Sequence, residues 1–368
     1  MLKHKEGGQM DARAMKILAA IVDEYIKTGE PVGSKALAEK PDISVSSATI
    51  RNTMAALEQE GYLDHPHTSA GRVPTYKGFR FYIDDLMSPL PLEQQDMERI
   101  DGILEKAAQD ASCPLEEALV QNASAALAEV TKCATFSTNH VSEFSVITKV
   151  DVIPTGRRMY VLLMITSTGA IKNRICRMQF DLTDEQMQFF NSFISNNLQG
   201  VNLSELTDEY LARLTEALGA YMITLSPLLD AVCELSSDLM KDSVEVQGQT
   251  NLIECQEFPV MDVMKFLENK NELSALLDGT FSGINVKFGG EDGGSTFAIS
   301  NSSFVSGTYY KDGKPAGTLG VIGPMRLDYR RIIPYIEYFS SRITRLLSES
   351  PEQQPQIESE VSDNGEQR

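Results

Sequence analysis

A short stretch of small and polar residues is the first place where this sequence could do chemistry: Ser46-Ser47-Ala48-Thr49-Ile50-Arg51-Asn52. In the major groove of B-DNA, arginine pairs well with guanine and asparagine with adenine. Hydroxyl and backbone N–H groups at a helix N-terminus bind phosphate. We therefore expect this stretch, with Ser46 as its helix cap, to contact double-stranded DNA. Ser47 and Thr49 would lie on the sugar-phosphate backbone, and Arg51 and Asn52 on base edges.

Further polar residues near this stretch are also suited to binding double-stranded DNA. Lys35 precedes this stretch and is suited to phosphate. Arg72 is expected in a hairpin loop, where a cation enters the minor groove or grips phosphate. His67 and Ser69 belong to the same loop and are candidate DNA contacts. His65 and His67 alternate as a metal pair would, but two such ligands are weak support for a site, so no metal or cofactor is expected.

The surrounding sequence predicts the elements that would hold these residues. Apolar residues at helical spacing predict one helix that ends at Gly29. A short second helix capped by Ser34 follows, and then a third, Ser47–Glu60, capped by Ser46. Two strand-like pieces surround a loop between residues 62 and 75. This order is that of a winged helix-turn-helix, in which one helix enters the major groove. A small interaction domain with the same elements is the alternative.

Charge is distributed unevenly along the chain. The net charge is −19, which by itself argues against a nucleic-acid partner. Residues 1–88 carry 11 basic and 12 acidic side chains, so −18 of that total belongs to residues 89–368. The tail Glu349–Arg368 has six acidic side chains and few apolar ones, and it is predicted to be disordered. The nearly neutral N-terminal region remains compatible with DNA. Because the rest of the chain is acidic and repels phosphate, we expect the protein to bind non-specific DNA weakly.

Length and composition exclude several classes of protein. A chain of 368 residues predicts two or three domains. The longest unbroken apolar run, Met159–Ile165, is too short to cross a membrane. The N-terminus lacks the apolar stretch of a secretory signal, and the five cysteines are too far apart for a disulfide framework or a zinc-ligand pair. We expect a cytoplasmic protein with buried free thiols.

Two stretches of the sequence resemble the family of heat-inducible transcription repressors called HrcA. The first follows the family's pattern closely in three parts: Tyr25–Ser34, Ser46–Asn52 and Pro66–Thr75. The second, Gly320–Tyr329, resembles the family's C-terminal signature, with Met325 and Leu327 in place of its usual Thr and Met. The matching stretches lie near both ends of the chain.

The resemblance implies a dimeric repressor in the stress response. Its parts would be a winged-helix domain, a GAF-like domain and a dimerising segment inserted into the GAF-like domain. It also implies a DNA target, the CIRCE inverted repeat upstream of chaperone operons. The chaperonin GroEL would keep the repressor active, and heat would inactivate it by unfolding. An inverted repeat suits a dimer, because one recognition helix reads too few base pairs for useful selectivity.

The remainder of the chain predicts an α+β body behind a linker at Ser88–Leu92. Two helices are predicted within residues 93–132, and strands are predicted at residues 143–153, 159–166, 170–180, 250–255, 284–288, 295–305 and 308–310. Helices are predicted at residues 183–241, 260–269 and 329–347. The expected multidomain α+β fold divides into a winged helix (1–88), a GAF-like domain in two segments (93–180 and 242–348), a mostly helical inserted dimerisation segment (181–241) and an acidic tail (349–368).

Catalysis is not expected from this sequence. Gly289–Gly294 lacks the Gly-Lys-Ser/Thr ending of a P-loop and the spacing of a dinucleotide fingerprint, so we interpret it as a hairpin turn. His140 is the only histidine beyond the first seventy residues, and no nucleophile motif surrounds it. Two non-enzymatic alternatives stay open. One is a winged-helix repressor controlled by a small metabolite bound in the GAF-like domain, and the other is a purely structural dimer module.

Overall fold

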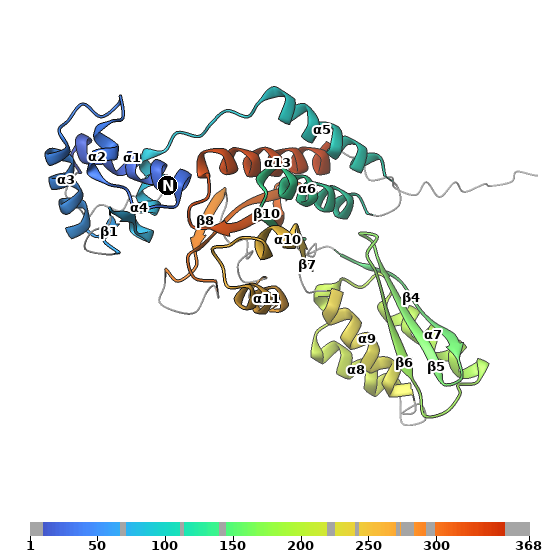
Figure 1. The fold of residues 1–368 in the computed structure, drawn as a ribbon. Helices are drawn as coiled ribbons and strands as arrows, with labels where there is room; N and C mark the ends of the chain where they lie inside the picture. The colour runs from blue at the N-terminus through green and yellow to red at the C-terminus, as the bar shows by residue number, and fades with distance from the viewer. Residues whose placement is uncertain are drawn as a thin grey trace, which may run out of the picture.

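The computed structural model describes residues 10–66, 71–110, 114–139, 145–218, 225–239, 243–269, 273, 283–291 and 299–349. Within these residues the chain forms three units (Figure 1). The N-terminal unit is helical with a small hairpin, the body contains a five-stranded sheet, and a third unit with a three-stranded sheet projects from the body. The expected multidomain α+β fold class is confirmed.

Two helices form the core of the N-terminal unit. α1 (Ala12–Thr28) begins after Asp11, whose side chain accepts a hydrogen bond from the Arg13 N–H. It ends at Gly29, whose φ of 70° is readily adopted by glycine. α3 (Ser47–Gln59) packs on α1. The buried apolar residues of the two helices are Ile17, Leu18, Ile21, Val22, Ile50, Met54 and Leu57.

The short helix α2 (Ser34–Ala38) joins α1 to α3 and begins differently from the prediction. Ser34, predicted to cap it, is its first helical residue, and Gly33 occupies the cap position. The Ser34 side chain is buried, and its hydroxyl shares a hydrogen bond of 3.1 Å with the Ser47 hydroxyl. The cap prediction was wrong because this hydroxyl bonds to the neighbouring helix instead of to its own backbone.

The wing is a minimal antiparallel pair of β1 (Leu63–Asp64) and β2 (Val73–Pro74). α4 (Tyr76–Phe81) follows directly, capped by the Thr75 side chain, and continues as one π-helical turn, η1 (Tyr82–Leu86). The predicted order of helices and hairpin is therefore present.

The body is built on an antiparallel sheet with helices on both faces. The strand order is β7-β3-β10-β9-β8. Val305 and Leu319 belong to the core formed with α6 and α13, while Phe136, Phe304 and Ile322 belong to the core formed with α10 and α11. The elements of the body are β3 (Ala134–Asn139), β7 (Ser243–Gln247), β8 (Ile284–Phe288), β9 (Ser302–Lys311), β10 (Lys314–Pro324), α5 (Gln94–Gln109), α6 (Leu115–Thr131), α10 (Gln249–Ile253), α11 (Val260–Glu268) and α13 (Tyr329–Glu349).

The third unit interrupts this sheet between β3 and β7, which are adjacent and antiparallel. Its own sheet has the order β4-β5-β6, and it encloses a separate apolar core. Its elements are β4 (Ile147–Gly156), β5 (Met159–Thr166), β6 (Ile171–Arg177), α7 (Asp184–Leu198), the 3-10 turn η2 (Leu203–Glu205), α8 (Asp208–Leu218) and α9 (Ser226–Leu239). We call this described stretch, residues 145–239, the inserted unit.

Two sequence-based assignments are corrected by this arrangement. The predicted boundary at residue 181 falls inside the inserted unit, because the strands at 147–177 pack with α7 and α9 and not with the body sheet. Strand periodicity shows that a strand exists but not which sheet it joins. The strand predicted at residues 250–255 is helix α10, which starts after Gly248 at a φ of 65°. Within the described residues, no helix is long and apolar enough to cross a membrane.

Candidate nucleic-acid interface

α3 is held so that its N-terminal turn and one face point outward. The Ser46 side-chain oxygen accepts a hydrogen bond from the Thr49 N–H at 3.2 Å, which caps the helix. On the inner face Ile50, Met54 and Leu57 are buried against the rest of the N-terminal unit. Rotation of the helix would bring these apolar side chains into water, so the direction of the outward residues is fixed.

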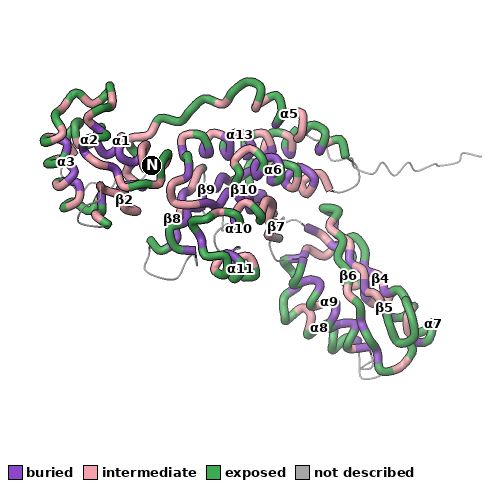
Figure 2. Tube along the Cα trace, in the orientation of Figure 1, coloured by how far each residue is buried: buried purple, intermediate pink, exposed green. Residues whose placement is uncertain are grey.

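Arg51 and Asn52 lie on the outward face. Both residues are exposed. Figure 2 shows that α3 has exposed segments beside its buried ones. Within the part of the chain that the structure describes, neither side chain has a hydrogen bond or ion pair. Ala48, one turn earlier, is also exposed, and its small side chain allows close approach. The arrangement leaves a guanidinium and an amide available to base edges, as the sequence predicted.

Ser47 and Thr49 are half-buried and form part of the turn itself. The Ser47 hydroxyl pairs with Ser34, and the Thr49 hydroxyl shares a hydrogen bond of 2.9 Å with that of Ser46. Because Ser34 and Ser47 touch, Lys35 stands close to the first turn of α3. The Lys35 side chain is exposed and has no partner among the described residues. One surface therefore combines the free N–H groups of a helix N-terminus with a cation, which suits a phosphate.

Arg72 lies at the base of the wing instead of in its loop. Its backbone N–H and carbonyl exchange hydrogen bonds of 2.9 Å with Val32, which follows α1. Its Nε atom lies 2.8 Å from Oε2 of Glu58 on α3, and the Arg72 side chain is only 20% exposed. The arginine thus ties the wing to α3, the helix that carries Arg51 and Asn52. The predicted role as a free wing cation does not match this position.

Gly71, which precedes Arg72 in the Pro66–Thr75 stretch, is required by the close approach of the backbone to Val32. A Cβ atom on Gly71 would lie 2.3 Å from the Val32 carbonyl oxygen, so only glycine permits the strand pair. The wing residues His67 and Ser69 lie outside the described residues, and their assignment as DNA contacts stays a prediction. Among the described residues no group of three His, Cys, Asp or Glu side chains could hold a metal ion.

Glu58 is a candidate functional residue that sequence reasoning missed, because it forms an ion pair with Arg72. It lies two turns after Arg51, on the same side of α3, and nothing in the local sequence distinguishes it from other acidic residues of the helix. Only the fold brings a strand that follows fourteen residues later onto this helix. A spacing rule for helical neighbours covers three or four residues and could not have found the pair.

The fold and this surface define a class of proteins, the winged-helix DNA-binding regulators. The family model for the HrcA protein C terminal domain matches residues 117–333. The chain is 31% identical to the heat-inducible transcription repressor HrcA of Acetivibrio thermocellus, over 91% of this chain and 95% of that relative. The HrcA protein of Ruminiclostridium cellulolyticum is also 31% identical, over 91% and 97%. The chain therefore belongs to the HrcA family of heat-inducible transcription repressors.

A solved structure has a similar fold. A crystal structure described as that of a hypothetical protein is 26% identical, covers 92% of this chain and 99% of its own, and superposes with a TM-score of 0.56. The resemblance that the sequence motifs indicated is thus confirmed. The relatives are named as transcription repressors and not as enzymes.

Proposed function

We propose that this chain represses chaperone operons by binding the CIRCE inverted repeat as a dimer. The observation that carries the proposal is the pair Arg51 and Asn52, exposed and unpartnered among the described residues at the start of a capped helix. Ser46, Ser47, Thr49 and Lys35 surround it with hydroxyl groups and one cation. This combination supports base contacts at the centre of the interface and phosphate contacts around it.

The inserted unit offers a surface for the second copy. One face of its sheet is covered by α7 and α9, and the other carries neighbouring apolar side chains across three strands. Ile153 lies opposite Val161, which lies opposite Ile175, and Ile165 lies opposite Ile171. Ile153, Ile171 and Ile175 are 44%, 59% and 63% exposed. Leu163 lies between the two rows, and Lys149, Asp151 and Asn173 lie beside these apolar side chains on the same face. Exposed apolar side chains bordered by polar ones favour an interface, and two-fold pairing would supply two recognition helices.

Heat would inactivate this repressor by unfolding it, and the chaperonin GroEL would restore it. The N-terminal unit and the body share one continuous apolar core, which runs from Ile17 and Leu18 of α1 to Phe339 of α13. Loss of packing in the body would therefore also disturb the unit that carries α3. Apolar core residues exposed by unfolding are the surface that a chaperonin would bind.

The experiment that tests the proposal is a salt-titrated binding curve with stoichiometry. The purified protein is compared on a CIRCE-type inverted repeat and on a scrambled duplex of equal length. We expect two chains per repeat and tight binding that survives moderate salt only on the repeat. Equal, weak binding to both duplexes would contradict the proposed base contacts.

A further inference from the structure

The N-terminal unit meets the body along two sides that differ in packing. On one side three aromatic rings meet: Phe79 of α4, Phe288 of β8 and Tyr329 of α13. All three residues are buried, and their ring centroids lie 6.1 to 6.5 Å apart. We call these three residues the aromatic cluster. Its close packing holds the two units together at this point.

Polar contacts reinforce the same side. The Tyr76 hydroxyl donates to the Gly289 carbonyl at 2.8 Å. The Arg80 guanidinium donates to the Val286 carbonyl at 2.6 Å and pairs with Glu291 at 2.8 Å. These contacts join the region of α4 to the region of β8, and Arg330 of α13 bonds to Ser88 and Leu90 in the linker. None of them reaches the end of α1, which must be held by other contacts.

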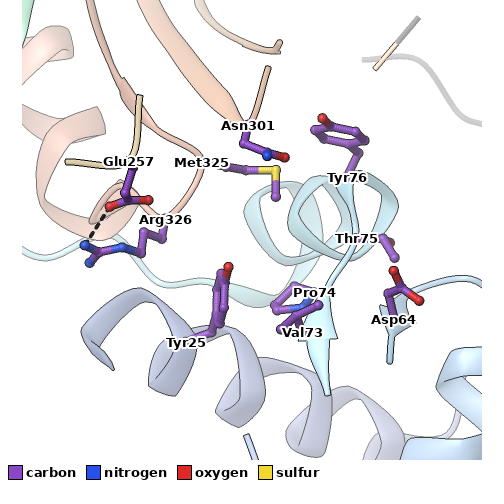
Figure 3. Close-up of a pocket in the computed structure, with 10 residues that line it drawn as sticks. All are labelled: Tyr25, Asp64, Val73, Pro74, Thr75, Tyr76, Glu257, Asn301, Met325 and Arg326. Carbon is purple, nitrogen blue, oxygen red and sulfur yellow. Dashed lines mark ion pairs between the residues drawn. The ribbon is translucent and has the colours of Figure 1, made fainter. Parts of the chain in front are cut away.

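The other side of the junction, near the end of α1, contains a cavity. A cavity of about 510 Å³ lies between the two units (Figure 3). Its walls include Tyr25, Val73 and Pro74 of the N-terminal unit and Asn301, Met325 and Arg326 of the body. Tyr25 and Met325 pack on the shared apolar core, but the cavity separates facing side chains of the two units, so direct packing between the units is looser on this side.

Arg326 spans the junction at the edge of this cavity. Its Nη1 atom donates to the carbonyl oxygen of Ile26, in the last turn of α1, at 3.3 Å. Its Nη2 atom pairs with Glu257 of the body at 2.6 Å (Figure 3). A Cβ atom on Gly29 would lie 3.3 Å from the Arg326 Nε, so the guanidinium group also packs against the end of the helix. A cation at a helix C-terminus is electrostatically favourable.

We propose that Arg326 is a positioning residue that fixes the angle at which the N-terminal unit stands on the body. α1 packs directly on α3, so a tilt at the end of α1 carries the recognition helix with it. In a dimer that angle sets the distance between the two recognition helices, which must match half-sites about 34 to 36 Å apart or a multiple of this. The inference rests on the proposed function, because the distance matters only when two copies bind one repeat.

The first test measures the angle without DNA. Spin labels are placed on the exposed positions Glu39 and Lys106 as E39C and K106C, with the accessible native cysteines replaced by serine and labelled chains diluted with unlabelled ones. Pulsed electron spin resonance should give one narrow distance distribution for the parent protein and a broad one for Arg326→Ala. An unchanged narrow distribution in Arg326→Ala would overturn the proposal, whatever the protein does with DNA.

The second test measures the consequence for binding. Arg326→Ala is compared with the parent on a single half-site, on the full repeat, and on repeats with a lengthened or shortened spacer. We expect half-site affinity to stay within about twofold and affinity for the full repeat to fall about tenfold or more, because only the joint engagement of two sites depends on geometry. The spacer preference should broaden. An equal loss on half-site and repeat would show a general folding defect and contradict the assignment.

Two further variants complete the design. Glu257→Gln keeps the arginine and removes only its ionic partner, so it should shift both readouts in the same direction by a smaller factor. Arg345→Ala removes an arginine of α13 that pairs with Glu349 away from the junction, and it should change neither readout. A parent protein without preference for the repeat would refute the proposed function, while the distance measurement would still decide the role of Arg326.

Discussion

The Nε atom of Arg72 lies 2.8 Å from Oε2 of Glu58, and this ion pair ties the base of the wing to the recognition helix. The backbone of Arg72 is bonded to Val32 at the same time, so three parts of the N-terminal unit meet at one residue. Both side chains are partly exposed, and such a pair contributes about 0.2 to 1 kcal/mol to stability. The pair would therefore contribute more to the orientation of the wing relative to α3 than to the free energy of folding.

The role of this pair can be separated from a direct DNA contact by Glu58→Ala. If the pair orients the wing, Glu58→Ala and Arg72→Ala should each lower operator affinity by about fivefold, equivalent to ~1 kcal/mol. Their losses should not add in the double variant, because both remove the same contact. If Arg72 instead grips phosphate, removal of the acid should raise affinity. Gel-shift titrations on the repeat distinguish the two results.

Arg51→Ala should weaken specific binding by about 1 to 3 kcal/mol and relax the base preference at one position in each half-site. The reason is that Arg51 is the exposed guanidinium at the start of α3 and has no partner among the described residues. Competition binding with single-base operator variants measures this. Gln59→Ala, exposed at the far end of the same helix, is the control and should bind like the parent. Equal losses on operator and random DNA would remove Arg51 from the base contacts.

Lys35→Ala should weaken binding to every sequence by a similar factor. Lys35 is exposed and directly follows Ser34, whose hydroxyl bonds to Ser47 in the first turn of α3, and a phosphate contact made there carries no base information. The slope of log affinity against log salt should become shallower by about one unit. Lys106→Ala, an exposed lysine of the body, is the matched control. An unchanged slope would place Lys35 outside the interface.

Much of the N-terminal unit could be predicted because its signals are local. Gly29 ends α1 and Ser46 caps α3 as expected, since a left-handed glycine and a capping hydroxyl act within a few residues of their position. The exposure of Arg51 and Asn52 follows in turn from the helical period that buries Ile50.

Long-range contacts could not be predicted in the same way. Nothing local in the sequence assigns Ser34 to Ser47 instead of to its own helix, or Arg72 to Glu58. The strand β3 (Ala134–Asn139) was missed because it is buried between β7 and β10 and lacks a clear alternation of polar and apolar residues. β3 is the last strand of the body before the inserted unit begins. Because β3 was not predicted, the predicted start of the inserted segment lies too late in the chain, at residue 181.

Ile175→Asp should convert the proposed dimer to a monomer and reduce binding to the full repeat. The side chain is 63% exposed on the edge strand β6, at one end of the apolar row Ile153, Val161 and Ile175, and a charge there would be buried in the proposed interface. Light scattering coupled to size exclusion measures the mass. Met261→Asp is the control, because Met261 of α11 is equally apolar and 67% exposed but belongs to the body. An unchanged mass for Ile175→Asp would exclude this face from the interface.

The thiol of Cys133 should report heat inactivation. Cys133 is buried between α6 and β3, and burial raises its pKa to about 11, so at neutral pH much less of it is thiolate than in an unfolded chain. Alkylation with iodoacetamide, followed by peptide mass mapping, should leave Cys133 unmodified in the folded protein. On heating, its modification should rise in parallel with the loss of operator binding, and chaperonin with ATP should restore both protection and binding. Loss of binding at temperatures where Cys133 stays protected would show that heat acts on the N-terminal unit or the dimer without unfolding the body.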